Sequence, residues 1–260
     1  MNTTIRIATA LALGLALHAS TSHAAYLVGS GRSDILIGLD DDNQDDPEIQ
    51  PPGTAANQSL NDADTLIGGR GDDILIGMLG SDVLLGGPGD DVMIGGIERG
   101  SQLPNSDIQI GDTGNDIAIW QGGDGSDLFD GGPGPRDALV FGTIDRDSVT
   151  NIPTIFPVDG RHSETGLPRA DVTGQGGFCT LEAVQHPEVR GFQFLVRFFS
   201  KANGNLLVTV RTRDVEQVFC TGQNAAVATF ADLTQPKPNF VDIAIDDVRG
   251  LNSDVARIIR

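Results

Sequence analysis

The first half of the chain alternates short aliphatic triplets with glycine-rich segments, and the triplets recur every nine residues. Four units follow one another without a gap, each with an aspartate before its triplet: SLNDADTLI (59–67), GGRGDDILI (68–76), GMLGSDVLL (77–85) and GGPGDDVMI (86–94). Three β-forming residues favour a short strand whose central side chain points to one face. One such strand buries little surface alone, so a stacked solenoid is predicted.

Similar units lie on both sides of this run. They cover residues 29–37, 111–119 and 122–130, a degenerate unit ends at Ile110, and the last copy has one extra residue before Asp137. Two insertions interrupt the series, one after Gly38 and one after Ile97. Glycine at the first, second and fourth positions of a unit permits backbone angles that are closed to other residues. Each glycine segment is therefore predicted to form a tight turn with its carbonyl groups directed inward.

Charge separates the two halves of the chain. Residues 25–141 contain 22 acidic and 4 basic residues, whereas residues 142–260 contain 14 acidic and 12 basic residues. A strongly acidic block repels nucleic acid and anionic membranes, and a cation is its natural partner. We therefore expect a cation, and no nucleic acid, to bind the first half.

The units resemble the G-G-x-G-x-D-x-U-x nonapeptides of the repeat-in-toxin (RTX), or haemolysin-type calcium-binding, family over about residues 29–141. The period, the turn and the acidic position recur together, which makes the resemblance specific. It implies a parallel β-roll in which two units form one coil and calcium lies between the turns of neighbouring coils. Units two apart would then share an ion, for example Asp64 with Asp82 and Asp73 with Asp91.

The chemistry of the residues also suits calcium as the cofactor. Calcium takes about six to eight oxygen ligands in irregular geometry, whereas magnesium demands near-octahedral sites. Transition metals prefer imidazole or thiolate groups, and the repeats contain neither. Asp72 and Asp90 are expected to be solvated turn residues. The candidate ligands are Asp34, Asp64, Asp73, Asp82, Asp91, Asp107, Asp116 and Asp127, together with the turn residues Gly69, Gly71, Gly87 and Gly89.

Calcium would also explain how so acidic a block folds. Ions that bind only the stacked state would offset the charge repulsion and add their binding free energy to folding. About four to six ions are expected from stacking neighbouring turns, with the first half unfolded in chelator. Two alternatives remain open: a flexible acidic linker, and a calcium-free solenoid with hydrogen-bonded aspartates.

The strand positions that flank each central residue should face outward, yet they are apolar. One interpretation is an exposed strip of residues with high β-propensity. The other is that the outer face of the roll packs against the second half or a partner, because contiguous apolar patches usually mark contacts. The residues concerned are Ile74, Ile76, Val83, Leu85, Val92, Ile94, Ile117 and Ile119.

The second half, residues 142–260, is predicted to be a compact, mostly antiparallel β domain, which makes the protein all-β. Residues 192–199 and 206–213 flank an Asn203-Gly204 pair, a signal for a β-hairpin. Further strands are expected at 215–220, 225–230 and 241–246, a short capped helix near the end, and an irregular connection over about 153–177. Cys179 and Cys220 lie in matching FCT contexts and are expected to form a disulfide rather than a catalytic pair.

Residues 1–24 have the features of a secretory signal peptide: one basic residue, an apolar run over 7–17 and small residues before Ala24. This predicts export to the periplasm or the extracellular medium, and no segment is apolar enough over about 18 residues to span a membrane. An uncleaved C-terminal secretion signal, usual in the RTX family, is not expected. Neither H-E-x-x-H nor G-x-S-x-G occurs, so no catalytic residue is assigned, and His162 in RHSET is expected in a solvated loop.

The combined prediction is an exported, non-enzymatic calcium-binding protein. Its second half would bind a protein partner, a surface polymer or the cell envelope. The alternatives are an extracellular hydrolase whose catalytic site lies in residues 142–260, and an RTX-like adhesin or matrix protein that assembles through the apolar outer face of the roll.

Overall fold

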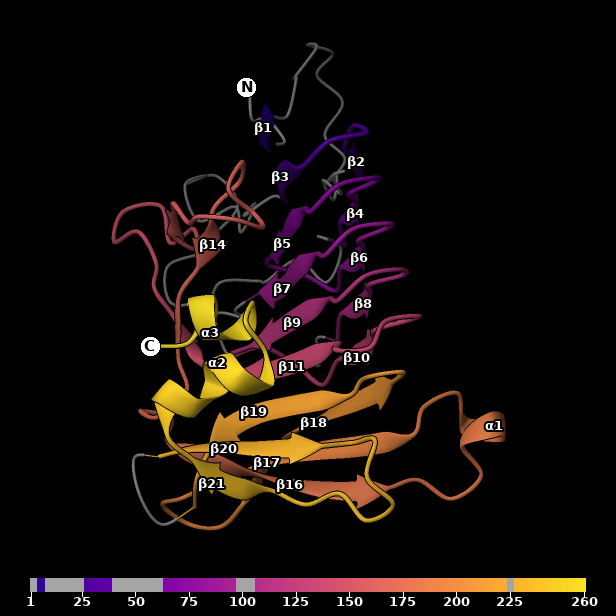
Figure 1. The fold of residues 1–260 in the computed structure, drawn as a ribbon, viewed down its shortest axis with the longest axis vertical. Coiled ribbons are helices and arrows are strands. Elements are labelled where there is room, and N and C mark those ends of the chain that lie inside the picture. The colour runs from indigo at the N-terminus through magenta and orange to yellow at the C-terminus, as the bar shows by residue number, and fades with distance from the viewer. Residues whose placement is uncertain (1–3, 8–25, 39–62, 97–105, 224–226) are drawn as a thin grey trace, which may run out of the picture.

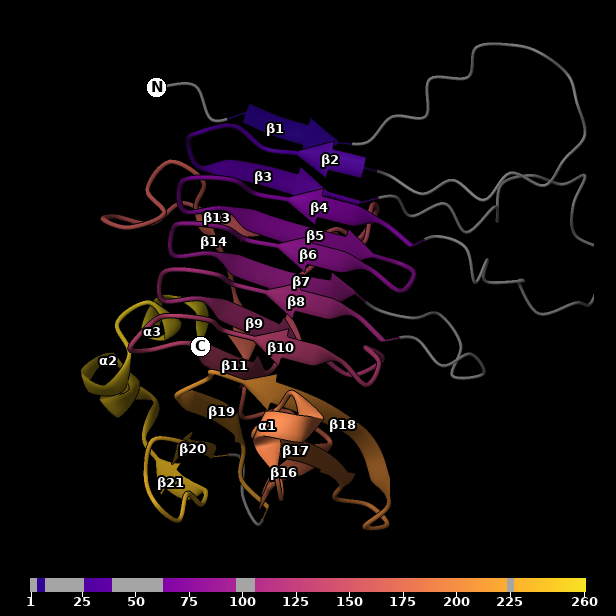
Figure 2. The ribbon, with the colours of Figure 1, turned by 90° about the vertical axis from the view of Figure 1, so that its right-hand side faces the viewer.

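A computed structural model describes residues 4–7, 26–38, 63–96, 106–223 and 227–260. The two insertions lie outside these residues, as does the expected leader apart from Thr4–Ile7. Two large sheets dominate the described structure, and their strands alternate along the repeats (Figure 1, Figure 2). The fold is all-β with a parallel β-roll, as predicted.

Sheet A contains every second strand of the repeats, three C-terminal strands and, at its opposite edge, a strand from the segment expected to be the leader. In spatial order it consists of β1 (Thr4–Ile7), β3 (Asp34–Ile37), β5 (Ile74–Met78), β7 (Val92–Gly96), β9 (Ile117–Trp120), β11 (Ala138–Phe141), β19 (Gln217–Thr221), β20 (Ala228–Asp232) and β21 (Val241–Ile243).

Sheet B contains the intervening strands. Its order is β2 (Tyr26–Val28), β4 (Thr65–Ile67), β6 (Val83–Leu85), β8 (Ile108–Ile110), β10 (Leu128–Asp130), β18 (Leu206–Arg213), β17 (Phe194–Ser200) and β16 (Gly177–Ala183).

The register of the parallel strands follows the nine-residue period. Leu75 on β5 lies opposite Met93 on β7, and Leu66 on β4 lies opposite Leu84 on β6. These central side chains are fully buried and belong to one cluster between the two sheets. Units two apart are therefore neighbours, and two units form one coil, as the resemblance implies.

Both sheets continue beyond the repeats without a break in pairing. Strand β18 pairs in parallel with β10, and β19 pairs in parallel with β11. The next pairs in each sheet, β17 with β18 and β19 with β20, are antiparallel. The predicted hairpin and strands of the second half are thus present, and backbone pairing crosses the proposed domain boundary at residue 141 in both sheets (Figure 1).

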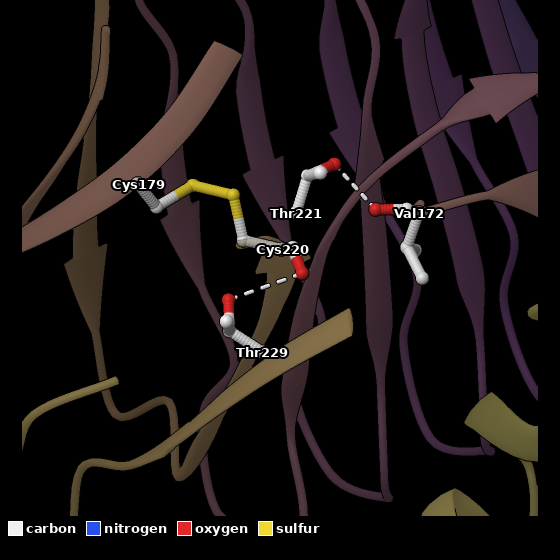
Figure 3. The surroundings of a disulfide bond; sticks show 5 residues. All are labelled: Val172, Cys179, Cys220, Thr221 and Thr229. Atoms are coloured by element: carbon white, nitrogen blue, oxygen red, sulfur yellow. Dashed lines mark hydrogen bonds between the residues drawn. A yellow bond between two sulfur atoms is a disulfide. The ribbon is translucent and has the colours of Figure 1, made fainter. Parts of the chain in front are cut away.

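The predicted disulfide between Cys179 and Cys220 is present and joins the two sheets. Cys179 lies on β16 in sheet B, and Cys220 lies on β19 in sheet A. In Figure 3 the Thr229 hydroxyl donates to the Cys220 carbonyl at 3.1 Å, and the Thr221 hydroxyl donates to the Val172 carbonyl. The bond therefore closes the C-terminal end of the interior between the sheets.

The outer face of sheet A is covered by the second half of the chain. The cover consists of the short strands β12 (Thr143–Ile144), β13 (Ile155–Phe156), β14 (Leu167–Pro168) and β15 (Ala170–Asp171) and of helices α2 (Val248–Leu251) and α3 (Val255–Ile258). Figure 1 shows β14, α2 and α3 beside sheet A. Figure 1 also shows helix α1 (Pro187–Arg190) away from this cover. Residues of the cover pack on Ile74, Ile76, Val92, Ile94, Ile117 and Ile119 in one buried cluster.

An exposed strip is therefore wrong for sheet A, because the chain buries that face itself. On sheet B the equivalent positions Val83 and Leu85 are only partly buried, and Ile108 is 40% exposed. The same repeat pattern thus produces one covered and one open outer face. Among the described residues no helix is long and apolar enough to cross a membrane.

Candidate metal centre

The predicted aspartates form two rows, one along each edge of the roll where the turns stack. All eight predicted aspartates are at most 2% exposed. Row A precedes the strands of sheet A and contains Asp34, Asp73, Asp91, Asp116 and also Asp137. Row B precedes the strands of sheet B and contains Asp64, Asp82, Asp107 and Asp127.

Each aspartate in a row hydrogen-bonds to the next coil in the same way. In row A the Asp73 backbone N–H donates to Asp91 Oδ1 at 2.7 Å, and the Asp91 N–H donates to Asp116 Oδ1 at 2.8 Å. In row B the Asp64 N–H donates to Asp82 Oδ1 at 2.7 Å. The pairs expected to share an ion, Asp64 with Asp82 and Asp73 with Asp91, are therefore direct neighbours.

In most of row A one carboxylate oxygen has no hydrogen bond within the described part of the chain. Oδ2 of Asp73, Asp91 and Asp116 is buried and has no hydrogen-bond partner among the described residues. A buried, unpaired carboxylate oxygen is costly, and metal coordination is one of the few ways to satisfy it. The glycines that open each unit leave room beside these atoms, because a Cβ at Gly68 would approach Asp73 Oδ2 to 2.5 Å.

Burial raises the pKa of these carboxyl groups in the metal-free protein. Desolvation raises the pKa of Asp91 to about 9, of Asp116 to about 8 and of Asp73 to about 7, with repulsion between neighbouring aspartates as a smaller contribution. In row B desolvation raises the pKa of Asp127 to about 6, although backbone N–H donation and the Arg211 charge oppose it. A bound cation would reverse the cost of ionising these groups.

The predicted turn glycines are stacked in register. A Cβ at Gly87 would overlap the Gly69 carbonyl oxygen, and one at Gly89 would overlap the Gly71 carbonyl oxygen. Gly69 and Gly87 also have φ of 109° and 103°, in the region that favours glycine. The backbones of Gly87 and Gly89 thus lie directly against the carbonyl oxygens of Gly69 and Gly71 in the neighbouring turn, an approach that a side chain would block.

A cluster of three carboxylates lies in row B. Ligand oxygens of Asp107, Asp124 and Asp127 all lie within 4.8 Å of one another, and the three residues are buried. Asp124 occupies the third position of the unit 122–130, where the repeat accepts any residue, so the pattern alone did not mark it as a candidate. The cluster adds a third charge to the pair that stacking brings together and fits a hard divalent cation.

Asp137 is a further member of row A that the fixed spacing did not select. Its extra preceding residue lengthens the turn, yet the Asp116 N–H donates to Asp137 Oδ1 at 2.7 Å, as in the regular coils. Desolvation, with repulsion from Glu216 and Asp214 among the smaller contributions, raises its pKa to about 7. The extra residue is accommodated within the turn, and β11 pairs with β9 in the regular register.

Asp90 is buried rather than a solvated turn residue as expected, whereas Asp72 is partly exposed. Asp90 is 8% exposed, and Asp90 Oδ1 accepts hydrogen bonds from Asn115. The Asp90 N–H donates to Asp72 Oδ1 at 3.0 Å, which forms a second ladder beside row A. Arg161 from the covering segment forms an ion pair with Asp90. These side chains therefore link neighbouring turns to one another and to the cover.

Comparison with protein families supports this geometry. Residues 60–96 match four copies of the RTX calcium-binding nonapeptide repeat. This segment is an RTX repeat region. The RTX match covers the gapless run of units, and the flanking units are included by their strand pairing and by their aspartates. Comparisons with curated proteins and with solved structures gave no significant match.

Proposed function

We propose that this is an exported calcium-binding protein whose RTX repeats fold around Ca²⁺ and whose C-terminal strands bind a partner or a surface. The observation that carries the calcium part is the row of buried carboxylates, with Oδ2 of Asp73, Asp91 and Asp116 unpartnered among the described residues. Calcium ions between the turns would satisfy these atoms. The same ions would neutralise charge that otherwise opposes stacking.

The donor set fits calcium better than other cations. Each neighbouring pair of turns offers carboxylates, for example those of Asp73 and Asp91, and the backbone carbonyls of tightly stacked glycine turns such as those of Gly69 and Gly87. Calcium accepts such an irregular all-oxygen set, whereas magnesium requires octahedral geometry. Imidazole and thiolate groups are absent from the repeat sequence, which disfavours zinc and copper.

Export is supported by two independent features. The disulfide between Cys179 and Cys220 is typical of proteins in oxidising compartments. Residues 1–24 have the composition of a secretory leader. In such compartments calcium is present at millimolar concentrations, the regime in which extracellular calcium modules bind.

Isothermal titration calorimetry with Ca²⁺ on residues 25–260 tests the calcium proposal. We expect several ions to bind and the far-UV circular dichroism to gain strand signal relative to EDTA. Asp91→Asn should weaken binding, whereas Asp246→Asn, which removes one exposed charge from the C-terminal region, should not. Absence of calcium uptake by the parent protein would rule the proposal out.

The open outer face of sheet B supports a second candidate function, an adhesin or matrix protein. Two rows of outward side chains cross sheet B in register. One consists of Tyr26, Thr65, Val83 and Ile108, and the other, entirely apolar, of Val28, Ile67, Leu85 and Ile110. Tyr26 is 69% exposed and Val28 is 41% exposed. Contiguous exposed apolar residues usually mark contacts.

Sedimentation velocity distinguishes this second candidate from a simple calcium-binding protein. Calcium-dependent association that Ile108→Lys abolishes would favour assembly through sheet B. A monomer in calcium at all accessible concentrations would count against it. Ile108→Lys should leave calcium uptake unchanged, because its side chain lies outside the aspartate rows.

The hydrolase alternative receives less support from the described residues. His162 is buried, only 3% exposed, rather than in a solvated loop, and desolvation lowers its pKa. His162 lines a hollow of about 640 Å³ together with Arg161 and Ser163. Residues 32–33 and 71–72 of the stacked repeat turns line the same hollow. Neither H-E-x-x-H nor G-x-S-x-G occurs in the sequence, so no catalytic group is assigned to this hollow.

A further inference from the structure

A segment of the second half, residues 213–217, continues the stacked turns of row A without resembling a repeat in sequence. The Gly131 N–H donates to the Arg213 carbonyl at 2.9 Å, as the Gly111 N–H donates to the Asp130 carbonyl at 2.8 Å one coil earlier. The Gln217 N–H then donates to the Asp137 carbonyl at 3.0 Å. The segment therefore enters and leaves the row at the same points as a repeat turn.

The first residue of this turn, Asp214, lies in register with the first glycine of the repeat turns: a Cβ on Gly131 would approach the Asp214 carbonyl oxygen to 2.3 Å, as a Cβ on Gly111 would approach that of Gly131 to 2.5 Å. Asp214 has φ of 49°, a left-handed conformation that is uncommon for residues other than glycine. In the two neighbouring row A turns the left-handed residue comes one position later, with φ of 87° at Gly132 and 75° at Asp112. Residues 213–216 thus form a shortened turn with the same start as its neighbours.

Glu216 takes the place of the aspartate in this shortened turn. The Asp137 N–H donates to Glu216 Oε2 at 2.8 Å, just as the Asp116 N–H donates to Asp137 Oδ1 at 2.7 Å. The turn is shorter than a repeat turn, and the additional methylene of glutamate extends the carboxylate to the position that aspartate occupies elsewhere. Row A therefore ends in a carboxylate supplied by the second half.

Asp137, the residue that contacts Glu216, has a buried carboxylate oxygen, Oδ2, that is available to a cation. Asp137 is fully buried, and its Oδ2 has no hydrogen-bond partner among the residues that the structure describes. That oxygen faces the turn backbone, because a Cβ on Gly134 would lie 2.7 Å from it. Asp214 and Asp130 add negative charge around Asp137. Arg213 is engaged in an ion pair with Asp130.

We propose that Asp137 and Glu216 bind a terminal calcium ion between the last repeat turn and the shortened turn 213–216. This inference rests on the proposed calcium-binding function and adds a site that the repeat pattern does not contain. The ion would connect turn 131–137 with the start of β19. Calcium binding in the repeats would thereby be coupled to the docking of the C-terminal strands.

Equilibrium dialysis with ⁴⁵Ca on residues 25–260 tests the terminal site. Glu216→Gln retains an oxygen acceptor for the Asp137 N–H and removes the charge. We expect this variant to bind one ion fewer, or to bind its weakest ion at least about tenfold less tightly. The matched control Glu188→Gln removes an exposed charge on α1 and should bind as the parent protein does.

Hydrogen exchange supplies a local readout. In the parent protein, calcium should protect the amides of Asp137, Glu216 and Gln217 as well as those of the repeats. In Glu216→Gln the protection of these three should be lost, while calcium still protects residues 73–94. Should Glu216→Gln misfold, Asp137→Asn must lose the same ion, and the double variant must lose no further ion.

The possible outcomes separate this site from the general proposal. If the parent protein takes up no calcium, the proposed function itself fails. If the parent protein binds calcium and both variants retain its stoichiometry, affinity and amide protection, the terminal site is overturned. Loss of different ions in Glu216→Gln and Asp137→Asn would overturn it as well.

Discussion

The repeat coils and the C-terminal strands belong to the same two sheets but are stabilised in different ways. In the repeats each coil adds a few aliphatic side chains to the interior and places buried carboxylates at both edges. In the C-terminal strands a disulfide joins the sheets, and Phe219 packs on Phe230 with ring centroids 5.1 Å apart. One region thus depends on its charge being balanced, and the other on covalent and aromatic contacts.

This comparison indicates why the two regions occur together. A stack of short coils exposes its ends and carries repelling charge, so it needs both a cation and a terminal support. The C-terminal strands extend both sheets, and their connecting segments cover the outer face of sheet A. The repeats are therefore expected to respond to conditions that leave the C-terminal strands unchanged.

Calcium removal should have the largest effect, and that effect should be concentrated in the repeats and in the turn 213–216 that continues row A. Without the ion, the buried carboxylates of row A must ionise unpaired or take up protons, so the coils lose their stacked state. Hydrogen exchange with mass spectrometry in EDTA should show residues 63–96 exchanging rapidly and residues 194–213 still protected. Magnesium at the same concentration serves as the control. Equal protection of both segments in EDTA would remove the distinction between the regions.

Loss of the disulfide should destabilise the C-terminal strands rather than the repeats. In the chain-entropy picture a bond that closes a loop of 41 residues stabilises by about 4 kcal/mol. The double variant Cys179→Ser/Cys220→Ser, unfolded by urea in saturating calcium, should be less stable by about that amount. Reduction of the parent protein should reproduce the result, and a loss below about 1 kcal/mol would show that the bond is dispensable.

Two matched substitutions compare the outer faces of the roll. Ile94 on sheet A is fully buried under the C-terminal cover, whereas Leu85 on sheet B is only partly buried. Ile94→Ala should cost about 2–4 kcal/mol in calcium, and Leu85→Ala about 1 kcal/mol, because less apolar surface is lost from water on unfolding. Equal costs in urea denaturation would indicate that the face of sheet B is covered in solution.

Acidification should partly stabilise the repeats in the absence of calcium. This is the smallest of the four effects predicted here for the two regions. The folded-state pKa of Asp73, Asp91 and Asp116 is raised to about 7, 9 and 8 from an ordinary value of 3.8. At a pH between 3.8 and these raised pKa values the folded state binds more protons than the unfolded state. The free energy of unfolding therefore falls as the pH rises through this window.

The measurement is far-UV circular dichroism in EDTA. Strand signal from the metal-free repeats should increase as the pH is lowered from about 8 to about 5. Over the same range calcium affinity should decrease, because protons compete for the same oxygens. Strand signal that is lost on acidification in EDTA would contradict the assignment of these carboxyl groups as buried and unpaired.

The sequence by itself determined the periodic part of this protein. A nine-residue period with glycine turns and aliphatic triplets predicts a stacked solenoid, because only stacking buries the central residues such as Leu75 and Leu84. That arrangement fixes the neighbours of each strand and puts the sixth-position aspartates inside the edges. The hairpin at Asn203-Gly204 was also predictable, because its signal is local.

Tertiary structure decided the features that depend on non-periodic segments. The outer residues of sheets A and B have the same sequence character, yet only sheet A is covered, because the connections after β11 return along that side. Asp124 occupies a position that the repeat leaves free. Glu216 lies 79 residues after Asp137 and joins row A only because β19 pairs with β11. A repeat pattern specifies contacts at its own spacing, whereas contacts between distant segments arise only once the chain has folded.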